Sequence, residues 1–314
     1  MSKTTRLVLV LALALVSGLA LWNANTYPRI GQVAMAVGGQ LEARIHGLTE
    51  KTVQVGDVPY RVYEGGNPAN PTLVLLHGYS ADKDVWPRFA STLVDRYHVI
   101  IPDLLGHGET GYRDDWQYSV PSQSQHVLAL MEAMHVMNFH VIGNSMGGFI
   151  AAYLGLTAPD QVLSVVAIDP AGVVSPTPSK MERMLAKGRN PFEVHNADEF
   201  VEFYGMTMAK PPYLPRFVLD GMAQTYQERR PELARIVQDF RGKDMLDKRL
   251  REIKVPFLLI WGSKDELLDV SSVQVWQKGV PGIQVHLFPE LGHMPMVEAP
   301  AETATVVKSF LTQI

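Results

Sequence analysis

Short apolar runs and helical stripes alternate through most of the chain from residue 71 onward. Each run is continuous, which is typical of strands that are buried on both faces. The predicted strands lie at 72–76, 99–101, 139–142, 162–168, 255–262 and 284–288. Helical stripes predict helices near 86–94, at about 121–134 and directly after Gly147. This alternation predicts an α/β fold, with a mostly parallel central sheet that helices cover on both faces.

The predicted core opens with a β-hairpin, in which residues 52–55 and 60–63 are joined through Gly56-Asp57. The alternation stops over 172–253, an interval rich in methionine, proline and aromatic residues. Flexible and aromatic side chains suit a pocket that accepts varied apolar ligands. We therefore predict a helical cap (172–253) inserted over a core made of 49–171 and 254–314. The alternative is an ordinary helical subdomain whose apolar residues form only its own core.

The amino-terminal segment contains a long uncharged run. Residues 7–22 are almost wholly apolar and follow Lys3 and Arg6. A cleaved signal peptide is one interpretation, but its small-residue site at 18–20 would lie inside the apolar run. We favour a retained transmembrane anchor over 1–28, with Trp22 and Tyr27 as interface aromatics. The basic residues then place the N-terminus in the cytoplasm and the rest of the chain on the periplasmic or extracytoplasmic side. In a bacterium, the membrane that the anchor crosses would be the inner membrane.

A juxtamembrane helix is predicted over 29–48, after the anchor. Its apolar residues recur at helical spacing. They are Ile30, Val33, Ala34, Val37, Leu41, Ile45 and Leu48. This stripe has three candidate partners: the α/β domain, the bilayer surface, or a second protomer. The last would give a homodimer through the anchor and the juxtamembrane helix.

Composition narrows the chemistry. The chain has 314 residues, of which 46% are hydrophobic, enough for one large core. The net charge of −4 implies no nucleic-acid partner, and the absence of cysteine excludes disulfides and thiol catalysis. Histidine and glutamate do not occur at the spacing of a zinc site, and no glycine-rich phosphate loop is present. We expect neither a metal nor a cofactor.

Gly143-Asn144-Ser145-Met146-Gly147 is the most informative motif in the chain. It stands between a predicted strand and a predicted helix, which is the context of a nucleophile elbow. The flanking glycines leave room where strand and helix meet. We predict that Ser145 is a nucleophile.

A serine nucleophile needs a base, and the base needs an orienting acid. His293 and Asp265 follow the last two predicted strands, in the chain order expected on such a sheet. We predict His293 as general base and then acid, and Asp265 as the carboxylate that fixes its tautomer. Asp169, which follows the strand at 162–168, is the main alternative acid. Asp269 and Glu266 are two further alternatives, whereas His98 and His286 are interpreted as structural.

Acyl transfer also needs donors for the oxyanion. The backbone N–H of Met146 lies at the predicted start of the helix after Ser145. The second donor should come from the loop after the strand at 72–76, and we choose the N–H of Tyr79.

Three stretches together resemble the α/β-hydrolases, and specifically the branch of membrane-anchored monoacylglycerol lipases. They are 76–86 (LHGYSADKDVW), 143–148 (GNSMGG) and 260–270 (IWGSKDELLDV). The resemblance extends from about Leu48 to the C-terminus. It implies the same triad and oxyanion pair as the residues, and a lipid-like ester substrate. Bacterial relatives of this layout include esterases and phospholipases A, so the resemblance fixes the chemistry better than the substrate.

The predicted function is therefore a membrane-anchored serine hydrolase that cleaves fatty acyl esters of monoacylglycerols, lysophospholipids or phospholipids. A carbon–carbon bond hydrolase acting on ring-cleavage dienoates is the alternative within enzymes, because such enzymes have a similar elbow. Met294-Pro295-Met296 departs from that group, which favours an aromatic after the histidine. A non-catalytic lipid-binding protein of the same fold is the alternative outside enzymes, and a broken triad would mark it.

Overall fold

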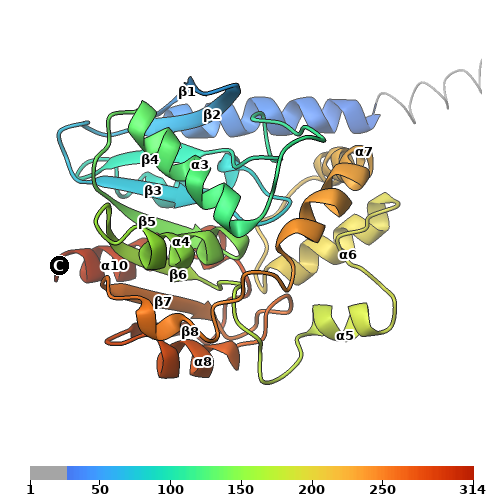
Figure 1. Cartoon of the computed structure of the whole chain (residues 1–314). Coiled ribbons are helices and arrows are strands. Elements are labelled where there is room, and N and C mark those ends of the chain that lie inside the picture. Colours follow the sequence, from blue (N-terminus) through green and yellow to red (C-terminus); the bar gives the residue numbers. More distant parts are fainter. Residues whose placement is uncertain (1–26) are drawn as a thin grey trace, which may run out of the picture.

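The protein folds around one eight-stranded sheet (Figure 1). A computed structural model describes residues 27–314. The strand order is β1-β2-β4-β3-β5-β6-β7-β8, and β2 is antiparallel to both of its neighbours, whereas all pairs from β4 to β8 are parallel. The strands are β1 (Leu48–Val55), β2 (Val58–Gly65), β3 (Thr72–Leu76), β4 (His98–Pro102), β5 (Phe139–Asn144), β6 (Val162–Ile168), β7 (Phe257–Gly262) and β8 (Gln284–Phe288). The mostly parallel sheet and the opening hairpin are confirmed.

Helices cover both faces of the sheet, as the continuous apolar runs predict (Figure 1). Helices α3 (Val120–Ala133), α4 (Met146–Thr157) and α8 (Ser272–Gly279) pack in one core cluster. Helices α2 (Pro87–Ala90), α9 (Pro295–Glu298) and α10 (Pro300–Leu311) pack in the other. Strand β3 shows the alternation, because Val74 belongs to the first cluster while Leu73 and Leu75 belong to the second.

The helix predicted near 86–94 is wrong in length. The structure has a 3-10 turn, η1 (Lys83–Val85), followed by only the four residues of α2. The hydroxyl of Ser91 donates to the carbonyl of Arg88, and that of Thr92 donates to the carbonyl of Phe89. Hydroxyl groups that bond nearby carbonyls compete with the helical pattern, so the segment continues as turns.

Three helices occupy the interval 172–253, and we call them the cap. They are α5 (Lys180–Ala186), α6 (Ala197–Thr207) and α7 (Arg216–Phe240), and a 3-10 turn, η2 (Leu250–Glu252), follows them. The cap lies beyond the edge of the sheet at which the parallel strands end (Figure 1). Val194, Phe200, Phe203 and Ala223 form a small core of its own. The cap also contacts the loop after β3, because the Tyr79 hydroxyl donates to the carbonyl of Leu233.

An N-terminal helix covers 27–45 of the described residues, so it overlaps the predicted anchor range at Tyr27 and Pro28, and Leu48 already begins β1. Its docked face contains glycines. A Cβ on Gly31 would lie 2.0 Å from the carbonyl oxygen of Phe217 in α7, and a Cβ on Gly39 would lie 2.3 Å from Asp84 Oδ2. The helix therefore packs with its small residues against the cap and against η1.

The predicted apolar stripe of this helix does not pack on the hydrolase domain. Five of its six large members lie in the helix and are between 52% and 72% exposed; they are Ile30, Val33, Val37, Leu41 and Ile45. The sixth, Leu48, is buried as the first residue of β1. The five helical members lie opposite the glycine face, because helical positions about two apart along the chain point to opposite sides. Of the three candidate partners, the hydrolase domain is therefore the wrong one.

Within residues 27–314, no helix is both long enough and apolar enough to cross a bilayer. The predicted anchor run at 7–22 lies outside the described residues.

Candidate active site

Ser145 stands between β5 and α4 in a backbone conformation that side chains rarely adopt, with φ of 57° and ψ of −117°. The turn is tight. A Cβ on Gly143 would lie 2.0 Å from the carbonyl oxygen of Gly147, and a Cβ on Gly147 would lie 2.2 Å from that of Leu76. Both neighbours of Ser145 are buried, whereas Ser145 itself is half-buried. The elbow therefore presents one hydroxyl at the edge of the sheet.

His293 and Asp265 meet directly. His293 Nδ1 lies 2.7 Å from Asp265 Oδ2, and both side chains are almost fully buried. The amides of Leu267 and Leu268 donate to the other carboxylate oxygen, at 2.8 and 3.0 Å. Because the carboxylate of Asp265 accepts these hydrogen bonds, it also acts as an acceptor toward His293. His293 therefore carries its proton on Nδ1, and its Nε2 is free to accept.

Asn144 connects the elbow to this pair. Its Nδ2 donates to the carbonyl of His293 at 2.9 Å and to that of Ile168 at 3.1 Å. The residue before Ser145 thus fixes the backbone of the histidine loop. Among residues 27–314 the Ser145 hydroxyl has no side-chain hydrogen-bond partner, and catalytic hydrogen bonds often tighten only when substrate is bound.

The alternative acids are placed differently. Glu266 pairs with Lys180 Nζ at 2.6 Å, and Asp269 accepts the amide of Ser271 at 2.9 Å. Asp169 lies fully buried behind the pair and accepts the amide of Gly262 at 2.9 Å. The structure thus brings Asp265, rather than these three, into hydrogen-bond contact with His293.

The loop after β3 lies against the elbow. A Cβ on Gly78 would lie 3.0 Å from the Cβ of Ser145. His77 fixes this loop, because its Nε2 accepts the amide of Leu104 at 3.0 Å while its Nδ1 bonds the carbonyl of Gly78. Burial lowers the pKa of His77 to about 4, so the ring is neutral and Nδ1 is the donor.

The two predicted oxyanion donors flank this contact. Tyr79 follows Gly78 in the loop, and Met146 is the first residue of α4. Among the residues that the structure describes, neither amide has a hydrogen-bond acceptor. Amides at the start of a helix lack partners within the helix, so such groups can serve an anion.

No sequence pattern indicates how this loop is joined to the cap. The Tyr79 hydroxyl donates to the carbonyl of Leu233 at 2.8 Å, and the Ser80 hydroxyl lies 2.9 Å from the hydroxyl of Tyr226. Leu233 and Tyr226 both belong to α7. The Tyr79 ring also packs on Phe192, with 5.0 Å between ring centroids. Loop and cap are therefore joined at the side of the elbow.

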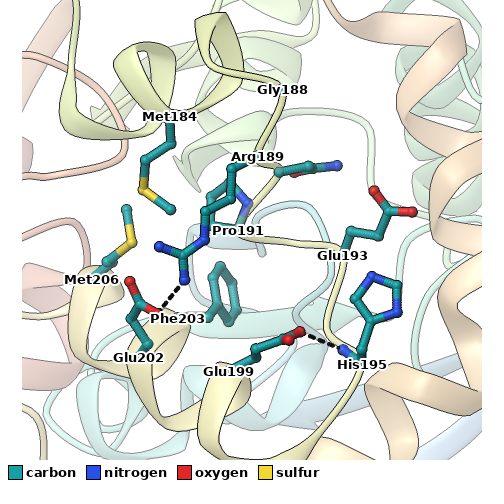
Figure 2. Close-up of a pocket in the computed structure, with 11 residues that line it drawn as sticks. Met184, Gly188, Arg189, Pro191, Glu193, His195, Glu199, Glu202, Phe203 and Met206 are labelled. Atoms are coloured by element: carbon teal, nitrogen blue, oxygen red, sulfur yellow. Dashed lines mark hydrogen bonds and ion pairs between the residues drawn. The ribbon is translucent and has the colours of Figure 1, made fainter.

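Two cavities open in and beside the cap. The first, of about 200 Å³, lies between α5 and α6. Figure 2 shows the side chains of Met184 and Met206 pointing toward one another on one side of it, with Phe203 beside them, while the Arg189–Glu202 ion pair stands across its middle. The second, of about 480 Å³, is lined by Met206 and by Asp265. Met206 therefore lines both the cap cavity and the cavity beside Asp265.

The chain matches the pattern of the Alpha/beta hydrolase family over residues 73–306, which include the elbow and the histidine. This range covers most of the chain. The protein belongs to the alpha/beta hydrolase family.

Named relatives of this hydrolase are lipases. It is 34% identical over 276 residues to Lipase 1 of Psychrobacter immobilis, covering 86% of each chain. It is 27% identical over 284 residues to a monoacylglycerol lipase of Xenopus laevis, covering 86% of this chain and 84% of that one. Among solved structures, a bacterial membrane phospholipase A superposes with a TM-score of 0.86 at 35% identity, covering 99% of each chain. The protein is thus a hydrolase of the lipase and esterase type.

Proposed function

We propose that this hydrolase cleaves fatty acyl esters of lipids through an acyl-enzyme on Ser145. The observation that carries the proposal is the Asp265–His293 bond, which leaves His293 Nε2 free to accept, together with the bond from Asn144, the neighbour of Ser145, to the carbonyl of His293. In this proposal Ser145 is the nucleophile, His293 the general base and then acid, and Asp265 the orienting acid.

The proposed chemistry balances in two steps. Ser145 Oγ attacks the ester carbonyl while His293 Nε2 takes its proton, and the N–H groups of Tyr79 and Met146 stabilise the oxyanion. His293 then gives that proton to the leaving alcohol, which leaves the acyl group on Ser145. Water, deprotonated by His293, attacks the acyl-enzyme, and His293 returns that proton to Ser145 Oγ as the acyl bond breaks and the fatty acid leaves.

The cap supports a lipid as the substrate. Its cavity combines the apolar side chains of Met184, Met206 and Phe203 with the charged pair of Arg189 and Glu202. Such a lining suits an amphiphile, because the acyl chain and the polar end each find matching contacts. The named relatives are lipases and a phospholipase A, and both classes act on lipid esters.

We further propose that residues 1–28 contain a membrane anchor, with the N-terminus in the cytoplasm and the hydrolase domain on the periplasmic side. Anchoring would hold the enzyme where its substrate is concentrated. The exposed stripe of the N-terminal helix supports the homodimer predicted from the sequence. Ala34 belongs to the stripe and Gly38 lies beside it, and a Cβ on Gly38 would meet nothing within 4 Å, so a second helix could approach closely there.

The testing experiment is release of free fatty acid by the full chain in detergent. Monoacylglycerol, lysophospholipid and diacyl phospholipid are compared, with Ser145→Ala against wild type. We expect Ser145→Ala to lose at least about 10³-fold in kcat, because removing the nucleophile leaves only oxyanion and binding contributions. The matched control is Ser309→Ala, at an exposed serine of α10.

Turnover near wild type in Ser145→Ala would show that another group is the nucleophile. Cleavage of a ring-cleavage dienoate without fatty acid release from any lipid would favour carbon–carbon hydrolysis instead.

A further inference from the structure

A second buried carboxyl lies behind the Asp265–His293 pair. Asp169 directly follows β6, is fully buried, and has a φ of 44°, a region that favours glycine. One carboxylate oxygen of Asp169, one of Asp265 and a ring nitrogen of His293 all lie within 4.8 Å of one another. The strained backbone and the burial together hold this side chain in the triad's immediate surroundings.

The hydrogen bonds of the two carboxyls are unequal. Asp265 accepts from His293 Nδ1 and from the amides of Leu267 and Leu268. Asp169 accepts only the amide of Gly262, through Oδ1. Its Oδ2 is buried and has no hydrogen-bond partner among residues 27–314. A buried oxygen without a donor is costly if charged, so the negative charge belongs on Asp265.

The surroundings of Asp169 agree with this assignment. Burial raises its pKa well above the usual range, and the nearby charges of Asp265 and Glu298 raise the pKa further. The amide of Gly262 opposes them, but only as a single neutral donor. The other titratable group within reach is His293, which is already bonded to Asp265. Two carboxyls this close in a dry site retain one proton between them.

We propose that Asp169 is a positioning residue of the triad, which keeps its proton on Oδ2 and directs it toward the carboxylate of Asp265. The inference rests on the proposed function, because it acts through Asp265 and His293. The two carboxyls then carry one negative charge, and a donor behind Asp265 limits its basicity. The proton on His293 Nδ1 consequently stays on the ring when Nε2 takes the proton of Ser145.

The test is the pH dependence of kcat/KM in Asp169→Asn and Asp169→Leu, measured on the full chain with the best lipid ester. Asn has the shape of a protonated Asp and keeps a donor, whereas Leu has neither charge nor donor. We expect Asp169→Leu to lower kcat about tenfold, because a charged hydrogen bond is lost. The apparent pKa of the acid limb of the kcat/KM profile should rise. Asp169→Asn should recover most of that loss and shift the acid limb by less than about 0.3 pH unit.

An ionised Asp169 would give a different result. Removing a negative charge this close to His293 would lower the apparent pKa of the acid limb in Asp169→Asn by about one pH unit or more. That result would overturn the proposal. Equal losses in the two variants, with unchanged limbs, would reduce Asp169 to a packing role and would also overturn it. If Asp169→Leu fails to fold, the acid limb of Asp169→Asn decides alone. Ser145→Ala tests the proposed function separately, because it must be inactive whichever state Asp169 adopts.

Discussion

Gly147 and Gly205 are both helical glycines, but only one of them has room for a side chain. A Cβ on Gly147 would lie 2.2 Å from the carbonyl oxygen of Leu76, whereas a Cβ on Gly205 would meet nothing within 4 Å. We expect Gly147→Ala to destabilise the protein by more than about 2 kcal/mol, because backbone must move. Gly205→Ala should stabilise it by about 0.5–1 kcal/mol through helix propensity.

Thermal unfolding of the two variants, in one detergent, checks this prediction. A Gly147→Ala protein as stable as wild type would mean that the elbow relaxes at little cost.

Asp84 makes stability depend on pH. Burial raises the pKa of Asp84 to about 7, and the negative charge of Asp82 raises it further. The Tyr63 hydroxyl, which donates to Asp84 at 2.7 Å, acts in the opposite direction. At pH values between the usual pKa of 3.8 and about 7, the folded protein therefore keeps a proton on Asp84 that the unfolded chain has lost. The stabilisation is complete below about pH 4 and is lost as the pH rises through about 7.

The corresponding variant is Asp84→Asn, which can still accept from Tyr63. We expect it to add about 1–2 kcal/mol to the free energy of unfolding at pH 8 and little at pH 4. Urea unfolding at both values measures the difference. Asp95→Asn, at an exposed carboxyl, controls for the general loss of one charge. An equal gain at pH 4 and pH 8 would contradict the assignment.

At the scale of single residues, the sequence located the turn at Ser145 and the contact between Asp265 and His293, because the first is a local motif and the other two follow successive strands. Their catalytic roles stay predictions. The distance between Asp169 and Asp265 was not predictable, because it depends on how β6 and β7, whose paired residues are 92 positions apart, lie in the sheet. For the same reason the hydroxyl of Tyr79, which bonds a residue 154 positions away, gave no local signal.

Among the elements, α7 and the loop after β3 form one unit. Tyr79→Phe removes the bond between the loop and the Leu233 carbonyl of α7. We expect a loss of about 1 kcal/mol in stability and a fall of several-fold in kcat with little change in KM, because the loop that carries the proposed oxyanion donor is then less fixed.

Kinetics of Tyr79→Phe beside Tyr112→Phe supply the measurement and its control. Tyr112 bonds Asp114 at the surface and contacts neither the elbow nor α7 through its hydroxyl. A fall in kcat of the same size in both variants would argue against a specific role for the Tyr79 hydroxyl.

The N-terminal helix shows where periodicity alone misleads. Its apolar stripe was correctly predicted to share one face, but periodicity does not say what lies opposite that face. The docked side is made of Gly31, Gly39 and Ala43, which carry almost no hydrophobic signal yet permit backbone contact. Close helix packing is decided by small residues as well as by large apolar ones.

At the scale of the whole molecule, the exposed stripe predicts self-association. Val37 lies in its middle and is 59% exposed. Val37→Glu should shift the full chain in mild detergent from dimer toward monomer, by at least about tenfold in the dissociation constant, because a buried unpaired charge is costly at such an interface.

Light scattering with detergent correction measures the shift. Val174→Glu, at an exposed valine of the cap side, is the matched control. A wild-type chain that is monomeric at all concentrations would end the dimer proposal.

The contact between Gly31 and Gly221 has a mechanical consequence. A Cβ on Gly221 would lie 2.4 Å from the amide nitrogen of Gln32, so the backbones of the two helices are in direct contact, with no side chain between them. Gln32 Nε2 also donates to Thr225 and Glu228 of α7. The N-terminal helix and α7 are about 28 and 37 Å long, and Pro231 lies inside α7. A tilt of the first helix would therefore be transmitted to α7, and α7 holds the loop beside Ser145 through Tyr226 and Leu233.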